Sequence, residues 1–154
     1  GNDYLDYKIA EDGELCMHGD SIMLGYYKDP EATAEVIDAD GWFHTGDLAR
    51  KDEDGYYFLT GRKKNLIILD SGENISPEEL EGIVGKCEAV KECVVKEMGK
   101  KIGVVVYCDE DKQQQVRDFI TEANRTLPLY KRMSAVEFST EPLPRNGAGK
   151  LLRQ

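Results

Sequence analysis

Long apolar runs are missing from this chain of 154 residues: none approaches the ~20 residues that a membrane-spanning helix requires, so we expect no transmembrane segment. A basic surface is missing as well, because 30 acidic residues face only 20 lysines and arginines, for a formal net charge of −10. Nonspecific nucleic-acid binding needs a basic footprint, so this balance argues against nucleic acid as a partner. It still permits a local basic site for a phosphate ligand.

Cysteine and histidine are scarce. The four cysteines are Cys16, Cys87, Cys93 and Cys108. No two of them have CxxC spacing, and the chain is long enough to bury a core, which favours reduced, mostly buried thiols in a cytoplasmic protein. The two histidines, His18 and His44, have no ligand-like spacing, so the sequence predicts no metal site. The acidic, polar first residues do not resemble a signal peptide.

Up to about residue 61 the sequence is rich in turns and short strands. "DYKIA" and "ELCMHG" are typical of strands on either side of the turn "EDGE". "DADGW" and "KDEDGYYFLTG" each place Asp-Gly before aromatic residues, which predicts a turn followed by a strand. "DPEATAEVI", at 29–37, predicts a short helix with Asp29 as its N-cap and Pro30 at its first position.

From residue 62 the pattern predicts alternating strands and helices. The expected elements, beginning with a buried strand, are strand 65–70, helix 76–87, strands 89–97 and 101–109, helix 112–127 and strand 134–139. Ser76 as N-cap, Pro77 at the first helical position and Glu79 in a capping box mark the start of the first helix. Two helices on a small sheet predict an α+β domain over 62–154, preceded by the β-rich segment 1–61.

Three stretches carry side chains suited to chemistry. In "GWFHTGDLA", Gly46 lets the backbone approach a ligand, and Asp47 could accept two hydrogen bonds from a vicinal diol such as ribose; taken alone, the motif is better explained by a turn in which the Asp caps its own backbone. "GRKKNLIILDSGEN" joins a basic turn to a glycine loop. In "LPRNGAGKLLR", Gly147 and Gly149 precede Lys150, a compact cation that could neutralise charge on a phosphoryl oxygen, or could belong to a flexible basic tail.

The order of four stretches is more specific than any one of them. "GELCMHGDSIMLGYYKDPEAT", "DGWFHTGD", "GRKKNLIILDSGENISPEELE" and "LPRNGAGKLLR" together resemble the acyl-adenylate-forming ligases, the superfamily of acyl-CoA synthetases, luciferases and peptide-synthetase adenylation domains. The resemblance runs along nearly the whole chain and is greatest to acyl-CoA synthetases, including the long-chain fatty acid group. Asn146 stands where the family commonly has threonine, and Met133 where it commonly has proline.

The resemblance implies a role for each of four side chains. The family's TGD aspartate, which binds the ribose hydroxyls of ATP, falls on Asp47. The arginine of its GR pair, which also reaches the ribose, falls on Arg62, and its hinge residue, two positions later, falls on Lys64. The lysine of its C-terminal GK pair, which contacts the reacting carboxylate and phosphate, falls on Lys150.

The second half-reaction of the family uses a different loop. The glycine loop that lines the path of the pantetheine thiol falls on Ser71, Gly72 and Glu73. The resemblance therefore implies ATP with Mg²⁺, CoA and a small carboxylic acid as substrates, and a rotation about the hinge that exchanges the lysine loop for the glycine loop. It leaves the acid unspecified, because the family's acyl pocket would lie upstream of Gly1.

The family's phosphate-binding loop and Tyr-Gly-x-Thr-Glu motif would also lie upstream of Gly1. The resemblance thus implies that 1–61 end a large N-terminal domain that is itself a missing partner, that 62–154 form the C-terminal lid, and that Gln154 lies close to the ligase's end. We expect an acid:CoA ligase as the parent protein and an inactive isolated chain, whose strand edges favour a homodimer. Two alternatives stay open: a non-catalytic binding or regulatory module, and a peptide-synthetase adenylation domain that delivers to a carrier-protein thiol.

Overall fold

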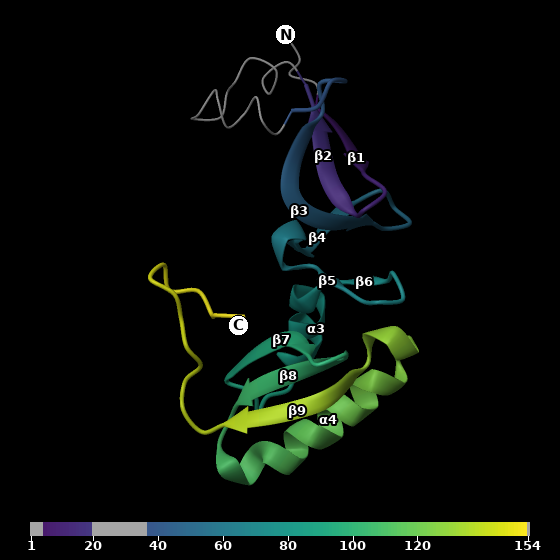
Figure 1. Ribbon diagram of the computed structural model, residues 1–154. Coiled ribbons are helices and arrows are strands. Elements are labelled where there is room, and N and C mark those ends of the chain that lie inside the picture. Colours follow the sequence, from purple (N-terminus) through teal and green to yellow (C-terminus); the bar gives the residue numbers. More distant parts are fainter. Residues whose placement is uncertain (1–4, 20–36, 154) are drawn as a thin grey trace. The chain divides into compact units, whose positions relative to one another are not determined.

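The computed structural model of the protein describes residues 5–19 and 37–153 (Figure 1). The chain divides into two compact units, Gly1–Lys64 and Asn65–Gln154. The helix expected at 29–37 lies, apart from Ile37, outside the described residues. Within those residues, no helix is both long enough and apolar enough to cross a bilayer.

The first unit contains a four-stranded antiparallel sheet in the order β1-β2-β3-β4 (Figure 1). Its strands are β1 (Asp6–Ile9), β2 (Glu14–His18), β3 (Phe43–Lys51) and β4 (Tyr57–Arg62). The predicted Asp-Gly turns directly precede β3 and β4. In the turn before β4, the Asp52 carboxylate accepts the N–H groups of Asp54 and Tyr56, both at 2.9 Å, and Gly55 adopts a φ of +88° that favours glycine.

The second unit is an α+β arrangement, as the sequence predicts. Its elements are η1 (Lys63–Asn65, at the boundary), β5 (Ile67–Ile68), β6 (Asn74–Ile75), α3 (Pro77–Val84), β7 (Glu92–Met98), β8 (Lys101–Tyr107), η2 (Glu110–Lys112), α4 (Gln113–Arg125), η3 (Leu129–Lys131) and β9 (Met133–Ser139). β7 pairs antiparallel with β8, and β8 pairs parallel with β9. A parallel pair needs a crossover connection, and α4 supplies it.

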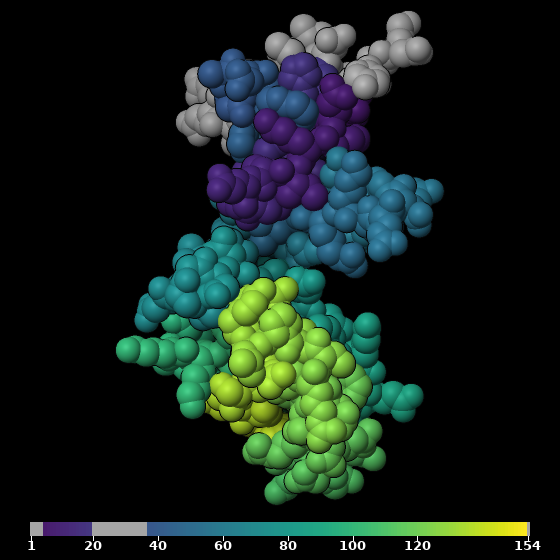
Figure 2. Space-filling view, turned by 90° about the vertical axis from the view of Figure 1, so that its right-hand side faces the viewer, coloured from purple at the N-terminus to yellow at the C-terminus, as the bar shows by residue number. Residues whose placement is uncertain are grey.

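One hydrophobic core joins both helices to this three-stranded sheet. From the helices, Leu80 and Val84 of α3 and Val116 and Ile120 of α4 are buried in it at helical spacing. The sheet contributes a continuous apolar strand, β8, as expected for a strand covered on its faces. In the space-filling view of Figure 2, α4 and the segment after it form much of the face of this unit that is turned to the viewer.

The start of α3 follows the prediction from the sequence. Ser76 is the N-cap, its Oγ accepts the N–H of Glu79 at 3.3 Å, and Pro77 occupies the first turn. This capping satisfies one of the amide groups that a helix leaves without an intrahelical partner. Local sequence chemistry was therefore sufficient to place this helix end.

The buried strand predicted over 65–70 is wrong in length and in burial. Only Ile67 and Ile68 form a strand, β5, which pairs with β6 in a two-stranded hairpin, and Ile68 is 66% exposed. The chain turns directly after it: the Leu69 N–H donates to the Glu73 carbonyl at 3.0 Å, and Gly72 has a φ of +96°. The turn residues override the apolar run, so that Ile67 is buried in the core, Leu69 packs against the core only in part, and the strand does not extend to residue 70.

Candidate functional site

Asp47 and Arg62 lie opposite each other on β3 and β4 of the first unit. Asp47 Oδ1 lies 3.1 Å from Arg62 Nε, and the arginine side chain is half exposed. The preceding Gly46 has a φ of +76°, a left-handed conformation that favours glycine at this position. An ionised carboxylate has about four lone-pair positions, so Asp47 keeps acceptor capacity for a diol beside the arginine.

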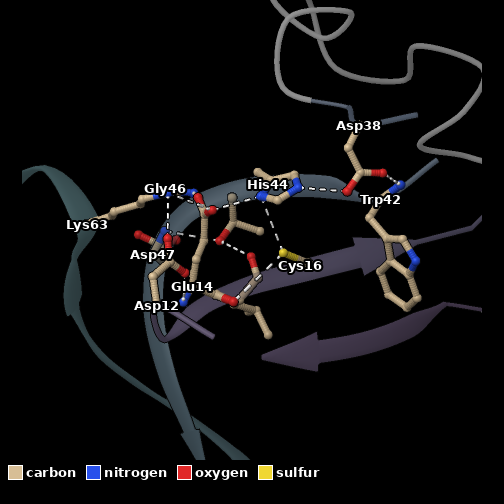
Figure 3. Close-up of polar contacts among 11 residues, drawn as sticks. Asp12, Glu14, Cys16, Asp38, Trp42, His44, Gly46, Asp47 and Lys63 are labelled. Atoms are coloured by element: carbon tan, nitrogen blue, oxygen red, sulfur yellow. Dashed lines mark hydrogen bonds and ion pairs between the residues drawn. The ribbon is translucent and has the colours of Figure 1, made fainter. Parts of the chain in front are cut away.

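A buried carboxylate, Glu14, supports this loop from β2. Glu14 is 4% exposed, and its Oε2 accepts the N–H of Gly46 at 2.9 Å. Its Oε1 contacts His44 Nδ1 at 2.8 Å and accepts a hydrogen bond from Lys63 Nζ at 3.2 Å. Glu14 therefore lies between Lys63 and His44, beneath the backbone that carries Asp47 (Figure 3). Burial opposes ionisation of Glu14, but the hydrogen bonds from His44 and Gly46 outweigh it and lower its pKa.

His44 lies between two carboxylates. Its Nε2 is 2.9 Å from Asp38 Oδ2, while its Nδ1 faces Glu14. Both ring nitrogens face carboxylates, which accept hydrogen bonds when ionised, so this geometry favours the doubly protonated imidazolium. The hydrogen bond with Asp38 and then the one with Glu14 raise the pKa of His44. Cys16 Sγ, from the strand opposite, lies 3.5 Å from the same Nδ1.

One ligand atom each from Glu14, Cys16 and His44 lies within 4.8 Å of the others, a grouping that the spacing of the histidines did not predict. The polar atoms of this group are nevertheless matched to one another: Glu14 accepts from a backbone amide and a lysine, and His44 donates to two carboxylates. The network thus accounts for the burial of Glu14 through hydrogen bonds and ion pairs alone. The absence of a metal site stays a prediction.

The stability of the first unit is expected to fall as the pH rises through the raised pKa of His44. The folded protein binds this proton more tightly than the unfolded chain, so the stabilisation is complete below the ordinary histidine pKa of about 6.5. The pKa values of Glu14 and Asp38 are lowered, so neither carboxylate gains a proton as the pH rises, and the pKa of Cys16 is raised by burial, which delays ionisation of its thiol. Urea unfolding between pH 6 and 9 measures the slope, which His44→Gln should flatten. An unchanged slope in that variant would contradict the assignment.

Lys150 lies in a hairpin of the second unit that its neighbours close tightly. Arg145 and Leu151 form a β-bridge, and the Asn146 N–H donates to the Lys150 carbonyl at 2.8 Å. The Asn146 side chain accepts the N–H of Lys150 at 3.0 Å, and Gly149 has a φ of +81°. Among the described residues the Lys150 side chain makes no hydrogen bond or ion pair, and the residue is exposed. The stretch that carries Lys150 thus forms a hydrogen-bonded turn, with the lysine exposed on it.

Two arginines attach this hairpin to the body of the second unit. Before the turn, Arg145 forms an ion pair with Glu92 of β7 and donates to the Gly149 carbonyl at 2.7 Å. After it, both terminal nitrogens of Arg153 contact the Glu81 carboxylate of α3, and Nη2 to Oε1 measures 2.8 Å. Each arginine bond is charge-assisted, and the Glu81 contact is bidentate, which fixes orientation as well as distance.

The predicted pantetheine loop forms the turn between β5 and β6. Gly72 N–H donates to the Leu69 carbonyl at 2.9 Å, and the Ser71 hydroxyl donates to the Glu73 carboxylate. Lys64, the predicted hinge, is exposed in η1 and is the last residue of the first unit. The structure therefore pairs Asp47 with Arg62, and it places Lys150 and the 71–73 turn on separate hairpins of the second unit.

Sequence reasoning missed the residues that support these side chains. Glu14 and Cys16 are two residues apart on β2 and share a face, so a glutamate at an inward position was the available signal. Its partners His44 and Lys63 are 30 and 49 residues away in the chain. The Arg145 and Arg153 ion pairs span similar or longer separations.

The α+β fold of this chain is the fold of the C-terminal parts of adenylate-forming ligases. A solved structure of O-succinylbenzoate coenzyme A synthetase from Bacillus subtilis, in complex with ATP and magnesium ion, superposes with a TM-score of 0.71 and 28% identity, over 97% of this chain and 33% of that one. No family model matches the sequence.

Curated relatives agree with this class. The chain is 41% identical over 155 aligned residues to a long-chain-fatty-acid–CoA ligase of Salmonella typhimurium, which covers 97% of the chain and 27% of that ligase. It is 36% identical over 151 residues to a probable 4-coumarate–CoA ligase of Dictyostelium discoideum, covering 95% of the chain and 27% of the relative. The chain is thus homologous to AMP-binding acyl- and aryl-CoA ligases, which confirms the resemblance, and it spans about a quarter of their length.

Proposed function

We propose that this chain is the C-terminal part of an ATP-dependent acid:CoA ligase. In the first half-reaction, a carboxylate oxygen of the acid attacks the α-phosphorus of ATP, the bond to pyrophosphate breaks, and an acyl-adenylate forms. In the second, the thiol sulfur of CoA attacks the acyl carbon, AMP leaves with the bonding electron pair, and the thiol proton is released. The names of the relatives, which are acid:CoA ligases, support CoA rather than a carrier protein as the acceptor.

The presentation of Lys150 is the observation that carries the proposal. The attack of a carboxylate on a phosphate brings two negative groups together, so a cation delivered at that point lowers the barrier. The hairpin holds the Lys150 backbone through Asn146 and holds its own ends through two arginines. Such attachment limits the loss of conformational entropy when the lysine reaches its target.

Asp47 and Arg62 are proposed to bind the ribose of the nucleotide. Arg62 fixes one carboxylate oxygen at 3.1 Å, which orients the remaining acceptor positions toward a diol. Mg²⁺ is proposed to arrive with the triphosphate, and the proposal assigns no magnesium ligand to this chain. When bound, the ion would offset the charge of the phosphates.

Lys64 is proposed as the pivot between the half-reactions, and Ser71, Gly72 and Glu73 as the lining of the thiol path. Two reactions on one substrate need two sets of groups, and rotation of the chain that follows Lys64 relative to the first unit would exchange the Lys150 hairpin for the 71–73 turn. In this proposal 1–61 close the large domain and 62–154 form the lid.

A chimeric ligase tests the proposal. The matching C-terminal quarter of the Salmonella typhimurium relative is replaced by this chain, and formation of acyl-AMP and acyl-CoA is followed by chromatography. We expect both products from the chimera and neither from the isolated chain, which spans only 27% of the relative. The relative without its C-terminal quarter serves as the control. A chimera that unfolds as cooperatively as the relative but forms no acyl-adenylate would refute the proposed function. Acyl-CoA synthesis by the isolated chain would refute its expected inactivity.

A further inference from the structure

Lys63, directly before the proposed pivot, is attached to the first unit by two carboxylates. Its Nζ lies 2.8 Å from Asp12 Oδ2 and 3.2 Å from Glu14 Oε1. Both partners belong to the same turn into β2, because Asp12 Oδ1 accepts the N–H of Glu14 at 3.1 Å. The contact with Asp12 contributes most to the raised pKa of Lys63, which keeps the ammonium charged.

The Glu14 end of this attachment is rigid. Glu14 is 4% exposed and is held by the Gly46 amide and by His44, so it cannot follow a mobile lysine. The same carboxylate thus holds the backbone beside Asp47 and the side chain of Lys63 (Figure 3). Glu14 therefore contacts both Lys63, near the end of the first unit, and the loop proposed to bind the nucleotide.

Asn65, directly after the proposed pivot, is attached to the second unit. Its Nδ2 donates to Glu78 Oε1 at 2.6 Å, and Glu78 lies in the first turn of α3. Arg153 Nη2 approaches the same oxygen at 3.7 Å. Two residues later Ile67, which is 8% exposed, enters the core of the second unit. The second unit is therefore fixed to the chain from Asn65 onward.

Lys64, between these two residues in η1, is the one of the three whose side chain contacts neither unit by a hydrogen bond or ion pair among the described residues. Lys64 is exposed, and within residues 5–19 and 37–153 its side chain makes no hydrogen bond or ion pair. The boundary of the two compact units falls between Lys64 and Asn65. The side-chain contacts that would resist a rotation in this stretch are therefore made by the residues on either side of Lys64.

Resting on the proposed function, we propose that Lys63 and Asn65 are positioning residues that confine the rotation between half-reactions to Lys64, one attached to each unit. If either attachment is lost, the rotation spreads over more backbone dihedrals, and the Lys150 hairpin and the 71–73 turn arrive in a wider range of orientations. A misplacement of about 1 Å at a reacting centre can cost on the order of 10²-fold in rate. Lys63 and Asn65 thus act through the residues that they place.

Backbone ¹⁵N relaxation on the 154-residue chain tests the attachments directly. In the unchanged chain we expect order parameters below about 0.6, the range of flexible backbone, at Lys64 alone within 61–67. Lys63→Met should extend the flexible window toward Arg62, and Asn65→Ala should extend it toward Ile67. Lys63→Arg, which keeps the charge, should restore the narrow window, and the exposed Lys86→Met should leave it unchanged. A window that Lys63→Met and Asn65→Ala do not widen would overturn the inference.

The chimera supplies the second readout. Lys63→Met is expected to lower kcat of the complete reaction on the order of tenfold with little change in KM for ATP, and Lys63→Arg should recover most of the rate. If Lys63 had a purely structural role, Lys63→Met would lower the midpoint of unfolding without lowering kcat selectively over KM. An active chimera whose kcat is unaffected by a widened window would also overturn the inference. An inactive chimera combined with the expected relaxation changes would refute the proposed function and leave the attachment of the pivot supported.

Discussion

Lys150→Ala in the chimera is expected to lower the rate of acyl-adenylate formation roughly 10²–10³-fold, the usual cost of removing one group that stabilises developing charge. The side chain is exposed and without an ion pair among the described residues, so its removal should leave the fold intact. The hairpin is closed by backbone contacts, Asn146 and two arginines rather than by the Lys150 ammonium. Pyrophosphate release measures this step.

The same variant should convert a supplied acyl-adenylate to acyl-CoA at close to the unchanged rate, because the second half-reaction uses the 71–73 turn. Lys100→Ala, at another exposed lysine of the second unit, is the matched control and should alter neither step. Equal losses in both half-reactions would contradict the exchange of the two hairpins. Full adenylation activity without Lys150 would remove it from the proposed mechanism.

Glu14→Leu is expected to lower the free energy of unfolding of the first unit by about 3 kcal/mol. Its removal leaves the Gly46 N–H without its acceptor and takes from His44 and Lys63 one of their two carboxylate partners, Asp38 and Asp12 remaining; breaking a buried ion pair costs roughly 3–5 kcal/mol. We take the low end because His44 and Lys63 are 34% and 46% exposed. Trp42, the single tryptophan of the chain, reports this unfolding in urea by its fluorescence.

Glu14→Gln separates geometry from charge, since its amide oxygen can still accept the Gly46 N–H. We expect it to lose less than half of the stability lost in Glu14→Leu. The exposed Glu11→Leu, three residues earlier, should shift the transition by no more than about 0.5 kcal/mol. If Glu14→Leu behaved like Glu11→Leu, the network around Glu14 would carry no stability.

Features that depend on neighbours in the chain could be predicted from the sequence. The start of α3 followed from Ser76 and Pro77, and the buried face of α4 from helical spacing. The Asp-Gly turns were equally local. The prediction of a strand over 65–70 was wrong because a local turn signal was underweighted. The apolar residues favoured a longer strand, but the turn at Gly72 begins within three residues of Ile68 and ends the pairing.

The sequence by itself determined the α+β class, the ligase resemblance and the identity of the candidate side chains, because motif order and turn formation depend on residues that are close together in the chain. Tertiary structure alone decided what holds those side chains. Glu14 meets His44 and Lys63 only after β2, β3 and β4 have paired, and Arg153 reaches Glu81 from 72 residues away. Such contacts pair charges across a sheet register or a chain reversal. Local propensity does not predict which charged residues will pair, because any of several glutamates and arginines could form such an ion pair and only the folded chain brings a particular two together.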